Sequence, residues 1–213
     1  MAHQQYLKPW VCAAIVIMFL VFPPCSLQAT YVFPFHIFTS DGAYHDDPGM
    51  NMYVVVSDGT GKVDFTFYNT STIDSSLARI YFDDGSLLGI STVENSQGTN
   101  FSEVFPGPGN LPSGEMLDPD FVADREFTIG AVQPPPENGV NPPDEWVKIH
   151  FNLVPGGTLE GVVSELYSGE LRVGIHIISL PDSSSESAIL VPEPATIMLL
   201  GLGALALLRK RKA

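Results

Sequence analysis

Hydrophobic and polar residues alternate along much of this chain, as they do in half-buried β-strands. Residues 62–68 alternate most strictly: the apolar members are Val63, Phe65 and Phe67, and the polar members are Asp64, Thr66 and Tyr68. We therefore expect a strand with one face in the core and the other in water. A β-rich run precedes it at 51–57, and the Gly-rich segment 58–61 between the two runs predicts a hairpin.

Four more runs have the composition or spacing of strands: 77–82, 86–91, 146–153 and 171–177. The first two flank an Asp-Asp-Gly turn and predict a second hairpin. The last two carry apolar residues at every second position, namely Val147, Ile149, Phe151 and Leu153, then Leu171, Val173, Ile175 and Ile177. Each of them is expected to bury one face of a strand.

One segment has the spacing of a helix. Leu159, Val162, Val163 and Leu166 fall on one face, and Thr158 stands where an N-cap residue is expected. Between residues 103 and 143, prolines and glycines predict long loops with one or two short edge strands. The whole pattern predicts an all-β body, a single antiparallel β-sandwich with a jelly-roll topology as one option.

The two ends of the chain carry continuous apolar runs. At the N-terminus, the run 10–22 follows Lys8 and leads to a small-residue exit at Ala29, which is the layout of a secretory signal peptide. We expect a signal helix within residues 1–29 and cleavage after Ala29. At the C-terminus, the run 197–208 has twelve apolar residues, and a helix of that length covers about 18 Å of the roughly 30 Å hydrocarbon core.

A basic block follows the C-terminal apolar run. It consists of Arg209, Lys210, Arg211 and Lys212. Such a block stays on the cytoplasmic side of a membrane, so the segment has the features of a stop-transfer element with the body outside.

Val191-Pro192-Glu193-Pro194 stands just before the apolar run. The tripeptide, the short hydrophobic helix and the basic end follow one another in this order, in a chain that also has an N-terminal signal. This arrangement resembles the PEP-CTERM sorting signal of exported Gram-negative bacterial proteins. The resemblance implies that a membrane-embedded exosortase recognises the motif residues Pro192, Glu193 and Pro194. It also implies removal of the tail, followed by release or attachment at the cell surface.

These features divide the chain into four parts: a signal peptide (1–29), a β-sandwich domain (30–182), a Ser-rich linker (183–190) and the sorting signal with its short transmembrane helix and basic tail (191–213). The body from Asn51 to about Ile177 is also similar to that of a group of PEP-CTERM exported proteins. The shared segments are the hairpin 54–69, the run 81–84 and the late strand 171–176. This resemblance implies a domain common to exported proteins and adds no mechanism.

The body is strongly acidic and free of cysteine. Residues 30–190 hold 23 of the 24 acidic residues but only five of the ten lysines and arginines. Nucleic acid is therefore excluded as an expected partner, because its binding needs basic patches. Cys12 and Cys25 both lie in the predicted signal peptide, so we expect no disulfide, thiol catalysis or cysteine-bound zinc in the mature protein.

Candidate chemistry in the body is limited. The sequence has no Gly-x-Ser-x-Gly, His-Glu-x-x-His or phosphate-loop motif. Two groups of aspartates offer oxygen ligands for calcium without EF-hand spacing, namely Asp41, Asp46 and Asp47, and Asp118, Asp120 and Asp124. Histidines that could converge on a transition metal are His36, His45, His150 and His176, and aromatic residues that could stack on sugars are Tyr44, Tyr53, Tyr68, Trp146 and Tyr167.

The resulting hypothesis is a non-enzymatic exported protein of the cell surface or extracellular matrix, associated with exopolysaccharide or biofilm, that needs no cofactor. Its partners are signal peptidase and exosortase during export, the inner membrane transiently, and exopolysaccharide. The precursor is expected in the inner membrane with its body in the periplasm. A carbohydrate- or calcium-binding module and an extracellular polysaccharide hydrolase are the alternatives.

Overall fold

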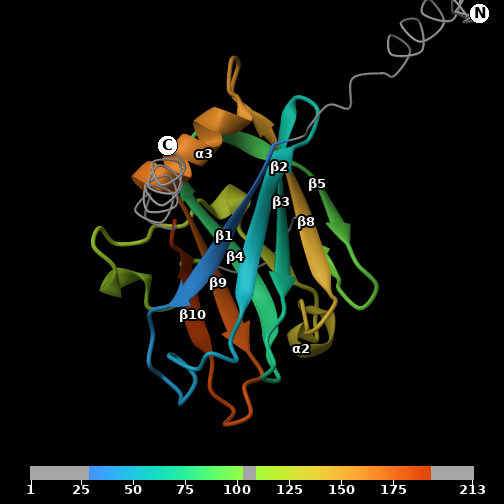
Figure 1. The fold of residues 1–213 in the computed structure, drawn as a ribbon, viewed down its shortest axis with the longest axis vertical. Coiled ribbons are helices and arrows are strands. Elements are labelled where there is room, and N and C mark those ends of the chain that lie inside the picture. The colour runs from blue at the N-terminus through green and yellow to red at the C-terminus, as the bar shows by residue number, and fades with distance from the viewer. Residues whose placement is uncertain (1–28, 103–108, 193–213) are drawn as a thin grey trace, which may run out of the picture.

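The computed structural model describes residues 29–102 and 109–192. The predicted signal helix, hydrophobic C-terminal helix and basic tail lie outside the described residues. Figure 1 shows the arrangement of the strands, which are β1 (Thr30–Ile37), β2 (Met52–Asp58), β3 (Lys62–Asn69), β4 (Ser76–Asp84), β5 (Leu87–Asn95), β6 (Phe101–Ser102), β7 (Ile129–Ala131), β8 (Trp146–Leu153), β9 (Leu171–Ile178) and β10 (Glu186–Leu190). The helical segments are the 3-10 turns η1 (Gly114–Met116) and η2 (Arg125–Phe127) and the α-helices α2 (Pro135–Asn138) and α3 (Leu159–Ser168).

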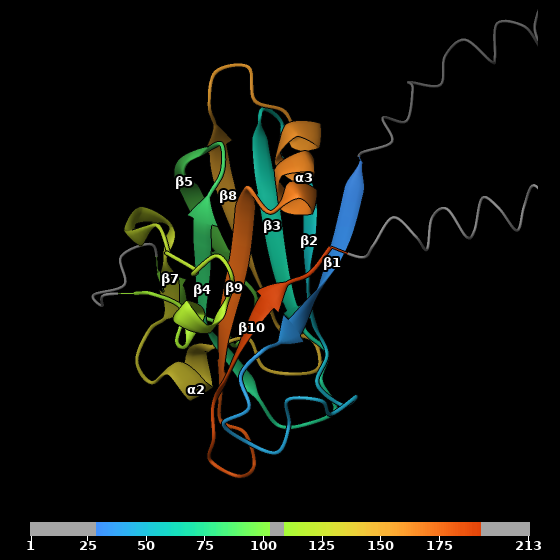
Figure 2. The ribbon, with the colours of Figure 1, turned by 90° about the vertical axis from the view of Figure 1, so that its left-hand side faces the viewer.

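The strands form one antiparallel sheet in the order β5-β8-β3-β2-β1-β10-β9-β4-β7-β6. The sheet rolls over so that its two halves face each other, as the two views in Figures 1 and 2 show. Its edges approach where Asn95 of β5 accepts from the N–H of Phe101 in β6 (2.7 Å) and donates to the same residue's carbonyl (3.3 Å). The prediction of a mostly-β, antiparallel body is confirmed, but the predicted β-sandwich is wrong, because the strands form one nearly closed, barrel-like sheet in place of two separate sheets.

Strand β1 joins the two halves of the sheet because it changes partner midway. Its first part, Thr30–Pro34, pairs with β2, and its last part, Phe35–Ile37, pairs with β10. Strand β1 therefore belongs to both layers.

The first predicted hairpin is confirmed, and the second is wrong. Strands β2 and β3 pair with each other around the turn 59–61. Strands β4 and β5 flank Gly85 as expected, but β4 pairs with β9 and β7, whereas β5 pairs with β8. Turn residues let the chain reverse its direction. The two strands still pair with different neighbours, because their apolar faces are buried in different halves of the sheet.

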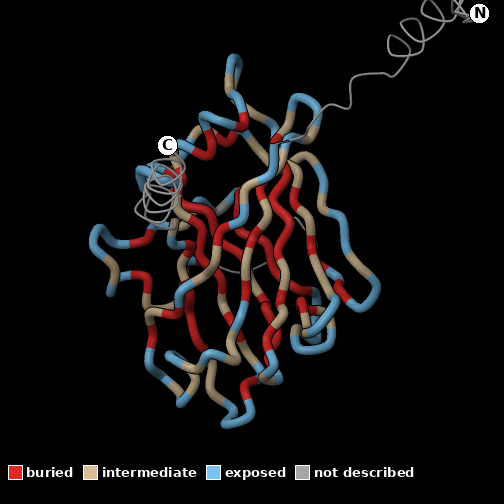
Figure 3. Tube along the Cα trace, viewed as in Figure 1, coloured by how far each residue is buried: buried red, intermediate tan, exposed pale blue. Residues whose placement is uncertain are grey.

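Edge-to-face aromatic rings fill the interior of the barrel. Phe65, Phe82 and Phe151 are fully buried, and their ring centroids lie 5.2 Å (Phe65–Phe82), 5.7 Å (Phe65–Phe151) and 4.7 Å (Phe82–Phe151) apart. This geometry suits the positive edge and negative face of aromatic rings. Figure 3 shows the buried segments gathered between the two layers.

The inward faces of the regular strands agree with the alternation in the sequence. Val63, Phe65 and Phe67 are fully buried, as are the inward residues of β8 up to Phe151 and those of β9. The expectation of a wet outer face on β3 is wrong, because Asp64 and Thr66 are buried as well. Strand β3 lies between β2 and β8, so neighbouring side chains cover its outer face.

Helix α3 has the predicted position and cap. The Thr158 hydroxyl accepts from the N–H of Gly161 (3.1 Å), and the buried residues are Leu159, Val162, Val163 and Leu166. The helix lies over one end of the barrel (Figures 1 and 2). Gly169 ends it in a left-handed conformation with φ 80°, which glycine adopts without steric cost.

In the described part of the proline-rich region 103–143 there is one short strand, β7. The segment 183–190, predicted as a linker, has a different structure, because Glu186–Leu190 forms β10 between β1 and β9. The folded body therefore extends to Leu190.

Candidate functional site

The predicted sorting tripeptide starts within two residues of the end of β10. In the ladder with β1, Leu190 lies opposite Phe35. The N–H of Val191 then donates to the carbonyl of Pro34 (3.2 Å). Pro192 has no N–H and cannot continue the ladder, and Glu193 and Pro194 lie outside the described residues. The motif thus follows directly on an internal strand.

The beginning of β10 is fixed by a buried carboxylate. Glu186 is 1% exposed and accepts from the hydroxyl of Thr39 (2.5 Å) and from the N–H of Gly42 (2.8 Å). The N–H of Ser187 donates to the hydroxyl oxygen of Thr39 (2.8 Å). The loop after β1 therefore satisfies the polar groups that β10 buries.

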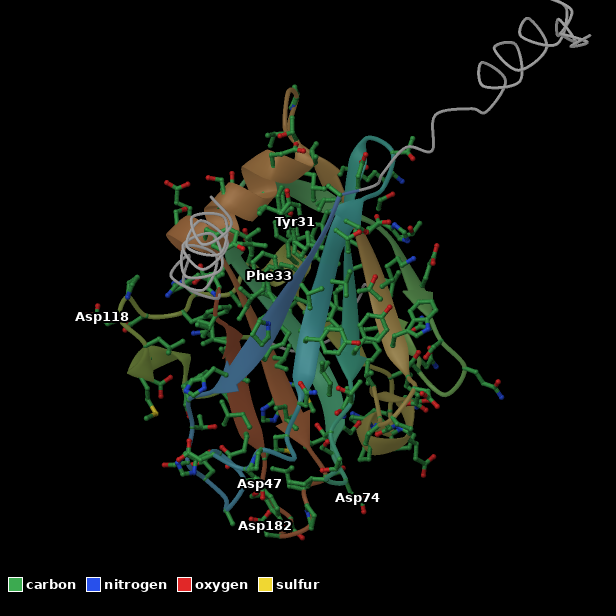
Figure 4. All side chains as sticks on the ribbon, viewed as in Figure 1. Tyr31, Phe33, Asp47, Asp74, Asp118 and Asp182 are labelled. Atoms are coloured by element: carbon green, nitrogen blue, oxygen red, sulfur yellow. The ribbon has the colours of Figure 1, made fainter. Side chains whose placement is uncertain are left out.

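The start of β1 and the end of β10 lie on the same flank of the barrel, next to α3 (Figure 2). This follows from their antiparallel pairing, since β10 runs back toward Thr30. Figure 4 places Tyr31 and Phe33 on the side of β1 near α3, and the Phe33 ring meets Tyr167 edge-on at 5.5 Å.

Three apolar side chains are exposed around this exit: Val32 (59%), Tyr167 (53%) and Val191 (40%). Among the described residues, β10 pairs with β1 only from Phe35 onward. The β10-facing edge of Tyr31–Phe33 therefore has no strand paired to it in the described part of the chain. We call the three exposed side chains, Val32, Tyr167 and Val191, the exit surface.

The first aspartate group lies in the loop between β1 and β2. Asp46 contacts His45 (2.6 Å), and Asp47 accepts from the N–H of Gly49 (2.8 Å), which forms a local turn. Asp41 is exposed. Across residues 29–102 and 109–192, no three His, Cys, Asp or Glu side chains are arranged to hold a metal ion.

The second aspartate group lies in the loops around η1 and η2. Asp118 and Asp124 are exposed. The carbonyls of Pro119 and Asp120 each accept from the guanidinium of Arg172 (2.6 Å). Arg172 also pairs with Asp83 and lies 5.3 Å from the centre of the Phe121 ring. The Arg172 side chain thus holds this loop by binding the loop's backbone carbonyls. Calcium binding at either aspartate group stays a prediction.

His150 lies between two carboxylates on the outer face of the sheet. Its Nδ1 is 2.6 Å from Asp64, and its Nε2 lies 3.1 Å from Glu94 without the alignment of a hydrogen bond. The two contacts are on opposite sides of the ring, so they cross-link β3, β8 and β5. This arrangement gives His150 a structural role between three strands.

His176 is held in a poorly solvated position on β9. Burial lowers its pKa, and the positive charge of Arg79 lowers it further, while the carbonyl of Glu186 and the charge of Asp41 act in the opposite direction. The neutral imidazole is therefore favoured. His36 and His45 are exposed in β1 and in the following loop, so the structure does not gather the four histidines.

The aromatic residues of the outer face form a row across three strands. Tyr53 stacks on Tyr68 with centroids 5.0 Å apart, and Tyr68 lies opposite Trp146 in the ladder. One face of each tyrosine ring is thus covered by the other ring, and the Lys148 ammonium lies 5.7 Å from the centre of the Trp146 ring. Sugar stacking on this row stays a prediction.

A polar pocket of about 480 Å³ lies between the β2–β3 turn and the start of α3. Its lining includes Lys62, Thr60, Thr158 and Glu160, and no histidine, serine or cysteine among the described residues. The lining therefore offers no nucleophile paired with a histidine base of the kind used in acyl transfer.

The described structure is a mostly-β body whose last strand, β10, ends two residues before the tripeptide 192–194 begins. Residues 190–212 match the family model of the PEP-CTERM protein-sorting motif. The chain therefore carries this motif, which implies a protein exported to the cell surface and sorted by an exosortase. No curated protein and no solved structure is significantly similar to the chain.

None of the helices in the described part of the chain is long and apolar enough to span a bilayer. The predicted stop-transfer residues 209–212 lie outside the described part.

Sequence reasoning found the tripeptide but missed its attachment to an internal strand. The signal that could have revealed β10 is the short apolar run Ala188-Ile189-Leu190, which continues into Val191.

Proposed function

We propose that this chain is a non-enzymatic structural protein of the extracellular layer, delivered to the cell surface or released there after its tail is removed. The observation that carries the proposal is the PEP-CTERM motif at 190–212, attached directly to the folded barrel at β10. An exosortase removes the tail, and the mature protein is the barrel, which contributes to the exopolysaccharide matrix.

The composition of the barrel supports this role. The excess of acidic residues between positions 30 and 190 keeps the body hydrated and repels other copies of itself. Both cysteines precede the body, so its stability does not depend on the redox state outside the cell.

The test is the intact mass of the protein recovered from an exosortase-bearing Gram-negative host, from the medium and from the cell surface. We expect a species that begins at Thr30 and ends near Pro192 to Pro194. Any additional mass would identify a surface modification. Recovery of the chain with residues 197–212 still attached would overturn the proposal and make the protein a membrane-tethered periplasmic domain.

A further inference from the structure

The short connection between β10 and the apolar run constrains how the tail can be processed. Five peptide units separate Pro192 from Ile197, and an extended chain covers at most about 17 Å over that length. The headgroup layer on one side of a bilayer accounts for about 6 Å of that distance. When the apolar run is inserted, the exit surface of the folded barrel is therefore held close to the membrane.

We propose that the exosortase acts on the folded body and docks on the exit surface, Val32, Tyr167 and Val191. This inference rests on the proposed function, because it assumes that an exosortase removes the tail. It adds the state of the substrate and the surface that the enzyme contacts.

The structure of β10 indicates that the body is folded when the exosortase cleaves the tail. The strand is paired on both sides, with β1 and with β9. Glu186, Ala188 and Leu190 are buried. Pulling the strand out would break both ladders and expose the interior, whereas cleavage beyond Pro192 leaves every described pairing of β10 in place.

The surroundings of the point where the chain leaves the barrel indicate where the exosortase docks. The chain leaves the barrel at Val191, beside the edge of β1 that β10 no longer covers. A membrane-embedded enzyme that binds the next residues therefore comes close to this part of β1, which has Val32 on its outer face and Tyr167 against Phe33 on its inner side. The side chains of Val32 and Tyr167 are more than half exposed, and apolar side chains with an open strand edge suit contact with a protein.

A disulfide lock tests the folded substrate. His36 and Ile189 lie opposite each other in the β1–β10 ladder, and the Cα separation of such a pair is about 5.5 Å, within the range of disulfides. The double variant His36→Cys/Ile189→Cys is expressed as the full chain with Cys12→Ala and Cys25→Ala, so that the new pair is unique. Cleavage of the oxidised, alkylation-resistant precursor is followed by intact mass and compared with both single-cysteine variants.

We expect the locked precursor to be cleaved within twofold of the rate of the single-cysteine variants. Accumulation of the locked precursor, relieved by reduction, would show that β10 must leave the barrel and would overturn the proposal. If the parent chain itself is not cleaved, the proposed function fails, which distinguishes the two failures.

A matched pair of surface variants tests the docking site. Val32 of β1 and Leu88 of β5 are both 59% exposed, and their strands are four positions apart in the sheet. Losing the burial of one valine side chain in an interface corresponds to about tenfold in affinity. We expect Val32→Asp to slow tail removal about tenfold at limiting enzyme and Leu88→Asp to leave it within twofold.

Thermal melting of the two full-length variants establishes that both barrels are folded. Equal cleavage rates for folded Val32→Asp and Leu88→Asp chains would overturn the docking surface.

Discussion

Arg172 of β9 and Asp83 of β4 lie opposite each other in the ladder and form an ion pair whose side chains are 16% and 3% exposed. The guanidinium also binds the carbonyls of Pro119 and Asp120, and Asp83 accepts from the N–H of Val122 (3.0 Å). One pair thus attaches the long loop after η1 to the sheet.

Arg172→Ala is expected to lower the free energy of unfolding by about 3 kcal/mol, because it leaves the Asp83 carboxylate buried without its cation. Urea denaturation measures the loss. The double variant Arg172→Ala/Asp83→Asn should recover part of it, since the uncompensated charge is gone. If Arg172→Ala is as stable as the parent, the ion pair makes no net contribution to the free energy of unfolding.

Glu186→Ala is expected to cost about 2 to 3 kcal/mol, because the Thr39 hydroxyl and the Gly42 N–H lose their buried acceptor. Glu170→Ala is the matched control, since Glu170 is exposed, and it should change stability by less than about 0.5 kcal/mol. Equal effects from the two variants would mean that the loop does not depend on Glu186.

Phe65→Ala is expected to cost roughly 3 to 5 kcal/mol, as a core truncation beside Phe82 and Phe151. The urea midpoint gives the value. A loss below about 1 kcal/mol would contradict the central position of this ring in the barrel.

The lowered pKa of His176 predicts a pH dependence of stability. Below its ordinary value of about 6.5, the unfolded chain takes up a proton that the folded chain does not, so the histidine makes stability fall as pH falls through that value toward the folded pKa. Denaturation at pH 7.5 and 5.5 should show this loss, and His176→Gln should reduce it, while His36→Gln, at an exposed position, should not. An unchanged pH dependence in His176→Gln would show that His176 is not its cause.

Glu193→Ala, or deletion of residues 209–212, is expected to leave uncleaved precursor in the inner membrane, because the motif or its membrane stop is damaged. Fractionation followed by intact mass measures this, with Glu170→Ala as the control. Normal release of both variants would contradict sorting through this tail.

The local pattern of the sequence predicts the strands and α3 because alternation and capping are properties of neighbouring residues. It does not predict that β4 and β5 separate, since strand partners are chosen by burial across the molecule. It also misses β10, because Glu186 and Ser187 are polar and their partner Thr39 is far away in the sequence.

The candidate site, like the fold, is predictable from the sequence only in part. The tripeptide and the basic end are recognisable in the sequence because they are contiguous. The exit surface is not, because it combines residues of β1 and α3 with Val191. Those residues meet only through the β1–β10 pairing and the contact of Phe33 with Tyr167.

Strand β5 lies at one edge of the sheet, and its register with β8 shifts between Leu87 and Gly89 and again between Ile90 and Thr92. Such irregularities bend and twist an edge, so that it is a poor template for another strand. In the function proposed above, the protein lies in an extracellular layer together with other copies of itself. The irregular register of β5 therefore disfavours strand-to-strand aggregation of the barrel at this edge.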